Sequence, residues 1–415
     1  MGAELTKRRL LWNAAGNIIY LACQWLITVL VTVLGGFGDA GVLSIAMSLS
    51  STFQTLAMFG IRNYQVSDLE GKYSNTGYLT LRAVTCSGAL LFCVAVSFFS
   101  GYNGGQQLAI LLFMLFRLAE SYSDVLHGIA QKNGRLDIAG KAFTIKGFGS
   151  LASFLIGFLL TEQLNMGLLT MTVFSALSTC FYDLPQVKRL TDFHLLGGIG
   201  ECGRLALETL PLCVYLFLYT ALSMLPKLIL EKTCGGDILG AYSSIFAPAL
   251  LLQIATGYLY NPFATQFAEF RRTGNGSAYR SLLMKLMGAI LAVAVLVMVA
   301  AQFLGEFALT LVFGEQIVAY VYMLNPILIL NFVISYFGLF AMLATVRRRF
   351  WYLIGAVSVG FAITAAVSGI LIREIGPNGA SYALILALLP AIAILGVGGL
   401  AREKHDVKEC ESDEV

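Results

Sequence analysis

Four ionisable residues recur at helical spacing inside an apolar stretch, and they carry the strongest chemical signal in the sequence. Arg117, Glu120, Asp124 and His127 follow one another at steps of three, four and three residues, which places them on one face of an α-helix. A charge at the centre of a bilayer costs about 2.5–3.5 kcal/mol on insertion scales. This face is therefore expected to contact protein or water rather than lipid.

Two interpretations of this charged stripe remain open. In the first, Arg117 pairs with Glu120 and Asp124 in a salt-bridge ladder that fixes the helix. In the second, Arg117 binds an anion such as a phosphate, while Glu120 or Asp124 accepts a proton or a cation. His127, near the inner end of the stretch, is interpreted as a polar terminal residue rather than a proton relay.

Polar residues on two other apolar segments are further candidates for a cavity lining. Asn13, Asn17 and Gln24 share one face of the first segment, and bulky amides on one face favour a water-filled space over lipid. A later segment contains Tyr215 and Tyr219. Near its outer end, Lys227 either extends to the membrane interface or receives a phosphate group on exit.

The composition requires that these residues sit in a membrane protein. The chain has 415 residues, of which 58% are hydrophobic and only 12% are charged, and its mean hydropathy is +0.78. A soluble domain carries about 25% charged residues. The apolar runs are long enough for helices of about 20 residues rather than the short alternating strands of a β-barrel. Eight cysteines and three histidines show no metal-site or disulfide spacing.

The sequence predicts an all-α polytopic protein with twelve transmembrane helices. Alternate connections and both tails contain all but four of the 27 basic residues, so the positive-inside rule places both termini in the cytoplasm. The expected spans are residues 10–34, 41–60, 78–100, 107–130, 141–161, 165–182, 203–229, 238–260, 281–303, 316–344, 350–372 and 379–401.

The longest connection divides these spans into two sets of six. We expect an N-terminal lobe (1–190), an interfacial linker (191–202), a C-terminal lobe (203–402) and a charged cytoplasmic tail (403–415). Residues 38–44 (GDAGVLS) and 236–243 (GDILGAYS) are similar at an offset of about 199. This similarity indicates a duplication in the same orientation, as in transporters built from parallel repeats.

Several short motifs, in this order and topology, resemble a known family. The chain resembles the polysaccharide and lipopolysaccharide flippases of the multidrug/oligosaccharidyl-lipid/polysaccharide (MOP) superfamily. The motifs that carry the resemblance are GIRNYQVSD (60–68), the charged stripe from 117 to 124, GIAQKNGRLDI (128–138), Pro226-Lys227, GGDILGAY (235–242) and LVFG (311–314).

The resemblance implies a V-shaped bundle of two six-helix lobes that works by alternating access. Such proteins move an undecaprenyl-pyrophosphate-linked oligosaccharide from the inner to the outer leaflet of a prokaryotic plasma membrane. By this resemblance, Arg117 and Lys227 are expected to bind the pyrophosphate. Coupling to H⁺ or Na⁺, with Glu120 or Asp124 as the carrier, is expected without any other cofactor or a metal. Membrane lipids and polysaccharide-assembly proteins are the expected partners of a monomer, and nucleic acid is not.

Two other functions are alternatives to this one. The first alternative is a cation-coupled multidrug and toxin extrusion antiporter of the same superfamily, in which Glu120 or Asp124 would carry the cation-coupled binding. The second is a membrane glycosyltransferase or acyltransferase. Short external connections and the lack of a plausible catalytic histidine argue against the enzyme, so no catalytic residue is assigned.

Overall fold

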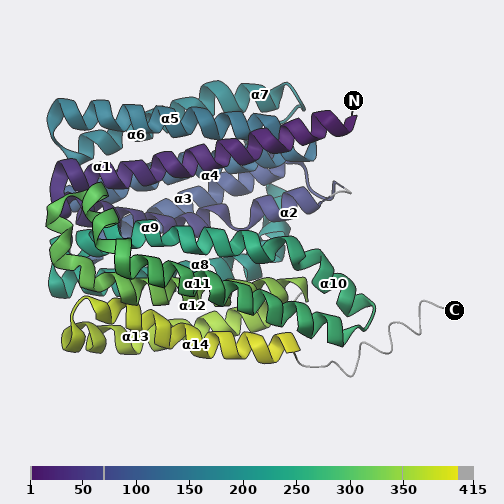
Figure 1. Cartoon of the computed structure of the whole chain (residues 1–415). Coiled ribbons are helices and arrows are strands. Elements are labelled where there is room, and N and C mark those ends of the chain that lie inside the picture. The colour runs from purple at the N-terminus through teal and green to yellow at the C-terminus, as the bar shows by residue number, and fades with distance from the viewer. Residues whose placement is uncertain (1, 69–70, 348, 401–415) are drawn as a thin grey trace.

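The computed structural model describes residues 2–68, 71–347 and 349–400, and nearly all of them are helical (Figure 1). The predicted all-α class is therefore confirmed. The elements, in chain order, are α1 (Gly2–Met58), α2 (Ile61–Ser67), α3 (Asn75–Phe99), α4 (Gly104–Lys132), α5 (Leu136–Thr161), α6 (Leu164–Ser178), the π-helix η1 (Thr179–Asp183), α7 (Leu184–Lys188), α8 (Ile199–Cys234), α9 (Gly236–Tyr260), the 3₁₀ helix η2 (Asn261–Phe263), α10 (Ala264–Arg272), α11 (Gly276–Phe313), the 3₁₀ helix η3 (Glu315–Met323), α12 (Leu324–Val346), α13 (Phe350–Ile375) and α14 (Asn378–Leu400).

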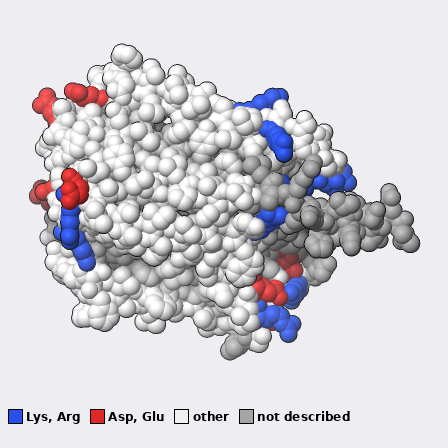
Figure 2. Space-filling view, turned by 90° about the horizontal axis from the view of Figure 1, so that it is seen from below, with Lys and Arg blue, Asp and Glu red and all other residues white. Residues whose placement is uncertain are grey.

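Most of these helices have the length and composition of membrane spans. Within the described ranges, ten helices are long and apolar enough to cross a bilayer. The helix α4, with 29 residues, is not among these ten and carries the charged stripe. A wide band without charged residues separates groups of charged side chains at the two ends of the molecule on the face in Figure 2. The chain is thus a multi-pass membrane protein.

The first helix differs from the two separate spans expected at 10–34 and 41–60. At 1.5 Å per residue, the 57 residues of α1 would extend about 85 Å as a straight helix, far more than one bilayer crossing. Gly36, with φ 75° and ψ −176°, interrupts it. The chain runs away from the N-terminal end of the bundle and returns to that end at α2 (Figure 1). Only glycine readily adopts this backbone conformation, so the reversal needs no loop.

The boundaries of other predicted segments also shift. The span predicted at 165–182 ends in the π-helix η1 and the short α7, and the span predicted from 316 begins with the 3₁₀ helix η3. The helix α8 already begins at Ile199, inside the segment expected as a linker, and it continues through Pro211 and Pro226. Exposed Leu195 and Leu196 precede it. The tail predicted at 403–415 lies outside the described residues.

The segments 38–44 and 236–243 contact each other at the end of the bundle away from the N-terminus. The hydroxyl oxygens of Ser44 and Ser243 lie 2.5 Å apart. A side chain at Gly41 would collide with the carbonyl oxygen of residue 236, and one at Gly240 would collide with the carbonyl oxygen of Phe37. Gly240 lies 199 residues after Gly41, and residue 236 lies 199 residues after Phe37, so the two contacts are equivalent and follow a local two-fold relation. We call this set of contacts the α1–α9 seam.

A disulfide can test this seam directly. In a background without native cysteines, the pair Ser44→Cys and Ser243→Cys should cross-link readily under mild oxidation, because the native hydroxyls are in contact. The yield is measured by mass spectrometry of digested protein. The pair Ser48→Cys and Ser243→Cys, one helical turn away from the seam, is the control. Equal yields for both pairs would contradict the close contact.

Candidate functional site

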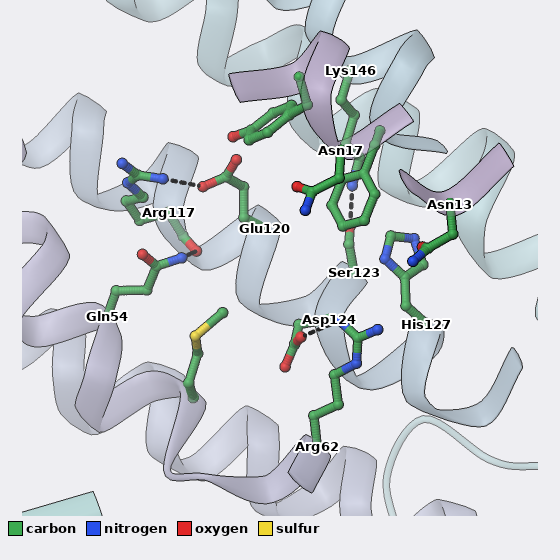
Figure 3. A pocket seen from close by; sticks show the side chains of 13 residues that line it. Asn13, Asn17, Gln54, Arg62, Arg117, Glu120, Ser123, Asp124, His127 and Lys146 are labelled. Atoms are coloured by element: carbon green, nitrogen blue, oxygen red, sulfur yellow. Dashed lines mark hydrogen bonds and ion pairs between the residues drawn. The ribbon is translucent and has the colours of Figure 1, made fainter. Parts of the chain in front are cut away.

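A polar cavity of about 390 Å³ lies among α1, α2, α4 and α5 (Figure 3). All four residues of the charged stripe that the sequence singled out line it. The cavity is lined by Asn13, Asn17, Tyr20, Gln54, Met58, Arg62, Arg117, Glu120, Ser123, Asp124, His127, Phe143 and Lys146. All of these residues belong to the first half of the chain.

The start of α4 determines where its charged residues lie. Asn103 and Gln106 form a reciprocal capping box at the N-terminus of this helix, which satisfies backbone groups that would otherwise lack partners. With the start fixed, Arg117 lies about 20 Å along the helix axis. That distance places it well inside an apolar layer of about 30 Å.

Arg117 has one carboxylate partner and capacity for another anion. Its Nη1 donates to Oε2 of Glu120 at 2.7 Å, and its guanidinium lies 5.1 Å from the ring centroid of Phe113. The side chain of Gln54 donates to the backbone carbonyl of Arg117 at 3.3 Å. The Nε atom of Arg117 is buried and has no hydrogen-bond partner. A guanidinium presents five N–H donors, so Arg117 can bind an oxyanion while it holds Glu120.

Asp124 does not pair with Arg117, contrary to the full salt-bridge ladder. Its two carboxylate oxygens accept hydrogen bonds from Arg62 at 3.0 Å and from Arg82 at 2.9 Å. Arg82 is fully buried and also donates to the carbonyl of Ala57 at 2.8 Å. Asp124 is therefore held between two arginines that were not predicted as site residues from the sequence.

A second buried ion pair lies against the inner part of this cavity. The Nζ atom of Lys146 lies 2.7 Å from Asp183 Oδ2 and 3.0 Å from Thr179 Oγ1, and it also contacts Ser123. His127 Nε2 lies 3.2 Å from Asp183 Oδ1. This group could not be predicted from the sequence, because its members come from three separate elements, α4, α5 and η1. The only signal available was an acid and a lysine within otherwise apolar segments.

The amide face of α1 enters this cavity only in part. Asn13 and Asn17 line it as expected, and the Oδ1 atom of Asn13 is buried without a partner. The hydroxyl of Tyr20 is also buried without a partner. Gln24 instead donates to the hydroxyl of Ser150 at 3.2 Å and does not line this cavity. Unpaired polar atoms of residues that line this cavity are what a polar ligand or water would satisfy.

The remaining predicted site residues lie in the second half of the chain. Tyr215 and Tyr219 stack on each other with ring centroids 6.3 Å apart, and Tyr219 also stacks on Phe337 at 5.3 Å. Lys227 lies 5.1 Å from the ring centroid of Phe246 on α9. None of these residues lines the cavity that contains Arg117. The predicted pyrophosphate ligands Arg117 and Lys227 therefore belong to different parts of the molecule.

Replacement of Asp124 should cost stability. The variant Asp124→Asn leaves the buried guanidinium of Arg82 without its carboxylate, and breaking such a pair costs about 3–5 kcal/mol. A markedly lower melting temperature of the detergent-purified variant is expected. The matched control is Glu269→Gln on α10, whose partner Arg272 is exposed. Equal melting temperatures for the two variants would contradict a structural role for Asp124.

The sequence comparisons find one informative relative among curated proteins. No family model matches the chain. The capsular polysaccharide biosynthesis protein CapF of Staphylococcus aureus is 24% identical over 302 residues, which cover 72% of this chain and 75% of that protein.

Solved structures match over nearly the whole chain. An inward-facing multidrug resistance MATE family transporter of the MOP superfamily matches with a TM-score of 0.64 and 11% identity, covering 98% of this chain and 96% of the other. The lipid II flippase MurJ, in an inward closed conformation, matches with a TM-score of 0.69 and 12% identity, covering 94% and 87%. The resemblance to the MOP superfamily is thereby confirmed. The chain is a multi-pass membrane protein with the fold of the transporters of the MOP superfamily.

Proposed function

We propose that this protein is a flippase that moves a lipid-linked oligosaccharide, carried on undecaprenyl pyrophosphate, from the inner to the outer leaflet of a bacterial plasma membrane. The observation that carries the proposal is the polar cavity around Arg117, a membrane-buried cation with unused donors. The similarity to a capsular polysaccharide biosynthesis protein supports a glycan cargo. The similarity in fold to the lipid II flippase MurJ supports a lipid-linked one.

The charges around the cavity suit an anionic head group. Its lining contains three cations and two carboxylates: Arg62, Arg117, Lys146, Glu120 and Asp124. A net positive charge in an apolar surrounding attracts an anion strongly, because the low dielectric constant screens it little. A phosphate group also matches the planar guanidinium of Arg117, which can form two parallel hydrogen bonds to it.

Twelve crossings fit the observed helices. Among the ten apolar helices of the described residues, α1 is counted once. The reversal at Gly36 would divide α1 into two crossings, and α4 would be one more. We place the boundary between two six-helix lobes near 191–202. The chain begins, and α14 ends, at the same end of the bundle (Figure 1). The basic residues that the sequence places on this side suggest that it faces the cytoplasm.

Lys227 is proposed as a second anion site along the path. It lies on α8 beside Phe246, and Phe246 is one helical turn from Ser243 in the α1–α9 seam. A phosphate released from Arg117 would meet this cation before the seam opens outward. Coupling to a proton or sodium gradient remains part of the proposal. Glu120 is the proposed carrier, because it is the carboxylate of the charged stripe that pairs with only one arginine.

An extrusion antiporter remains the second candidate, because several solved structures with this fold are MATE transporters. In that case Glu120 would bind a cationic drug or its coupling ion. The two functions separate in one experiment. Depletion of the protein in its own host should cause a completed glycan on polyprenyl pyrophosphate to accumulate, as measured by mass spectrometry of extracted lipids. An unchanged lipid profile with increased sensitivity to cationic drugs would favour the antiporter.

Arg117 is expected to be essential for flipping. Because Arg117→Ala alone leaves Glu120 unpaired in an apolar surrounding, we pair it with the double variant Arg117→Gln/Glu120→Gln, which removes both charges and retains hydrogen-bonding groups. Both should fail to flip a fluorescent polyprenyl-pyrophosphate disaccharide in proteoliposomes. Arg373→Gln, an exposed arginine at the end of α13, is the control. Wild-type flipping by the double variant would remove Arg117 from the anion site.

Lys227 should act on a later step than Arg117. In Lys227→Met the side chain keeps its length and its contact with Phe246 but loses the charge. Flipping should slow at least tenfold, equivalent to about 1.4 kcal/mol, while equilibrium binding of the same probe should change little. The variant Lys232→Met, near the end of the same helix, serves as the control. Normal flipping by Lys227→Met would assign Lys227 a structural role only.

A further inference from the structure

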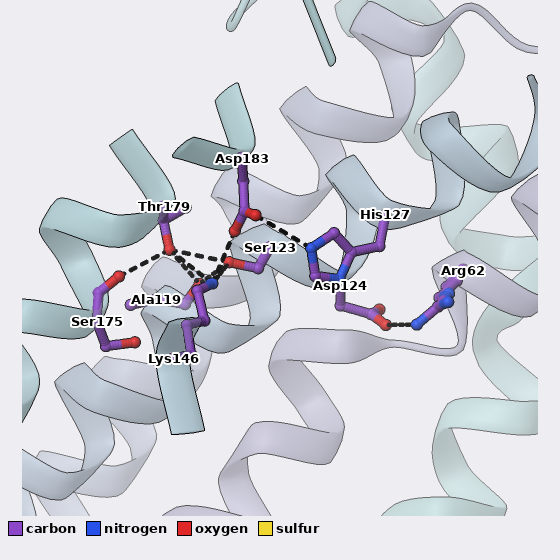
Figure 4. A network of polar contacts seen from close by, with 9 residues as sticks. All are labelled: Arg62, Ala119, Ser123, Asp124, His127, Lys146, Ser175, Thr179 and Asp183. Atoms are coloured by element: carbon purple, nitrogen blue, oxygen red, sulfur yellow. Dashed lines mark hydrogen bonds and ion pairs between the residues drawn. The ribbon is translucent and has the colours of Figure 1, made fainter. Parts of the chain in front are cut away.

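Three buried residues form a continuous hydrogen-bonded chain at the inner wall of the cavity (Figure 4). Asp183 accepts from His127 Nε2 through Oδ1 at 3.2 Å and from Lys146 Nζ through Oδ2 at 2.7 Å. The side chains of His127, Lys146 and Asp183 are 1%, 4% and 0% exposed. His127 and Lys146 line the cavity, whereas Asp183 lies behind them. Burial of an ionised group without a partner costs free energy. Here each buried ionisable group has a hydrogen-bond partner.

An irregular helix brings Asp183 into this chain. The π-helix η1 follows α6 directly and ends at Asp183. One residue fewer in this segment would rotate Asp183 by about 100° around the helix axis and turn it away from His127. Thr179, the first residue of η1, accepts from Lys146 and hydrogen-bonds Ser123 at 2.9 Å. A single π-turn within an α-helix frequently marks a functional site.

The hydrogen bond to Asp183 occupies one ring nitrogen of His127 and so determines which nitrogen is left to interact with a ligand in the cavity. An ionised carboxylate only accepts, so Nε2 carries the hydrogen and Nδ1 remains for the cavity that the imidazole lines. In the neutral ring, Nδ1 is an acceptor and repels an anion. In the protonated ring, Nδ1 becomes a donor with a positive charge. Proton binding therefore changes the imidazole of His127 from neutral to cationic, adds one positive charge to the cavity wall and leaves the bond to Asp183 intact.

The carboxylates around His127 are each paired with a cation. Asp124 is held by Arg62 from α2 and Arg82 from α3, and Glu120 is held by Arg117 on α4 itself. From α5, Lys146 pairs with Asp183 of η1. The helix α1 contributes uncharged Asn13, Asn17 and Tyr20. Lys188 on α7 is exposed.

We propose that His127 is a titratable cation of the anion site, positioned by Asp183 and Lys146, and that binding of a pyrophosphate diester is linked to uptake of one proton at His127 Nδ1. The inference deepens the proposed flippase function and rests on it. A water-borne proton forms the Nδ1–H bond when the anion binds, and it returns to water when the anion leaves. The sequence interpretation of His127 as a mere polar terminal residue would then be replaced.

The test measures proton-linked binding of a simple probe. Dimethyl pyrophosphate is a diester whose own charge is constant between pH 6 and pH 8, the range in which imidazoles titrate. Calorimetry on the full-length protein in nanodiscs should give roughly tenfold tighter binding at pH 6 than at pH 8, equivalent to about 1.4 kcal/mol. Titrations in buffers of different ionisation enthalpy should show proton uptake at the higher pH.

Variants distinguish this role from a structural one. His127→Gln should bind with nearly the same affinity at both pH values, whereas His194→Gln, on the exposed segment before α8, should behave as wild type. In Lys146→Met, Asp183 stabilises the imidazolium alone, so the pH at which affinity falls should move upward. A merely structural role would lower affinity equally at all pH values.

Each outcome bears on one proposal or on both. Affinity of the wild type that does not change with pH, or a pH dependence that survives in His127→Gln, would overturn the role of His127 and leave the flippase proposal in place. If the wild type fails to bind the probe at either pH, the anion site itself is wrong and both proposals fall. If His127→Gln does not fold, the shift expected for Lys146→Met decides alone.

Discussion

The arrangement of this protein follows from the need to pair every charge that is buried in an apolar bundle. Arg82 is fully buried, and the free energy to place it there is offset only because Asp124 and a backbone carbonyl accept its hydrogen bonds. The same requirement joins Lys146 to Asp183. Together with the pair of Arg62 and Asp124, these pairs connect α2, α3, α4, α5 and η1, so the helices of the first half are held by polar contacts as well as by packing.

This pairing also shapes the cavity. Most charges of the first half are used to hold helices together, and what remains toward the cavity is small: part of the guanidinium of Arg117, the imidazole of His127 and the amides of α1. Under the proposed function, such a site would bind a compact anion, and the rest of a large cargo would contact other surfaces. In the second half, the rings of Tyr215, Tyr219 and Phe337 stack on one another.

The sequence predicted the helical class and the charged face of α4 because both depend on local spacing. The pairing of Arg117 with Glu120 could be predicted in the same way, since residues three positions apart meet on a helix. The partners of Asp124 and His127 could not be predicted, because Arg62, Arg82 and Asp183 approach them only through tertiary packing. Gln24 was placed in the cavity by its helical phase, yet its contact with Ser150 depends on how closely α5 approaches.

The α1–α9 seam bears on how this chain has diverged. Two halves that arose from one ancestor are free to drift apart wherever each packs only within itself. At the seam, however, each half is the other's neighbour: Gly41 faces residue 236 and Gly240 faces residue 37, so a larger side chain in either copy meets the backbone of the other. The segments 38–44 and 236–243 therefore constrain each other's evolution. If the two halves are copies of one repeat, as the sequence predicts, this constraint would explain why the two segments remain similar where they contact each other.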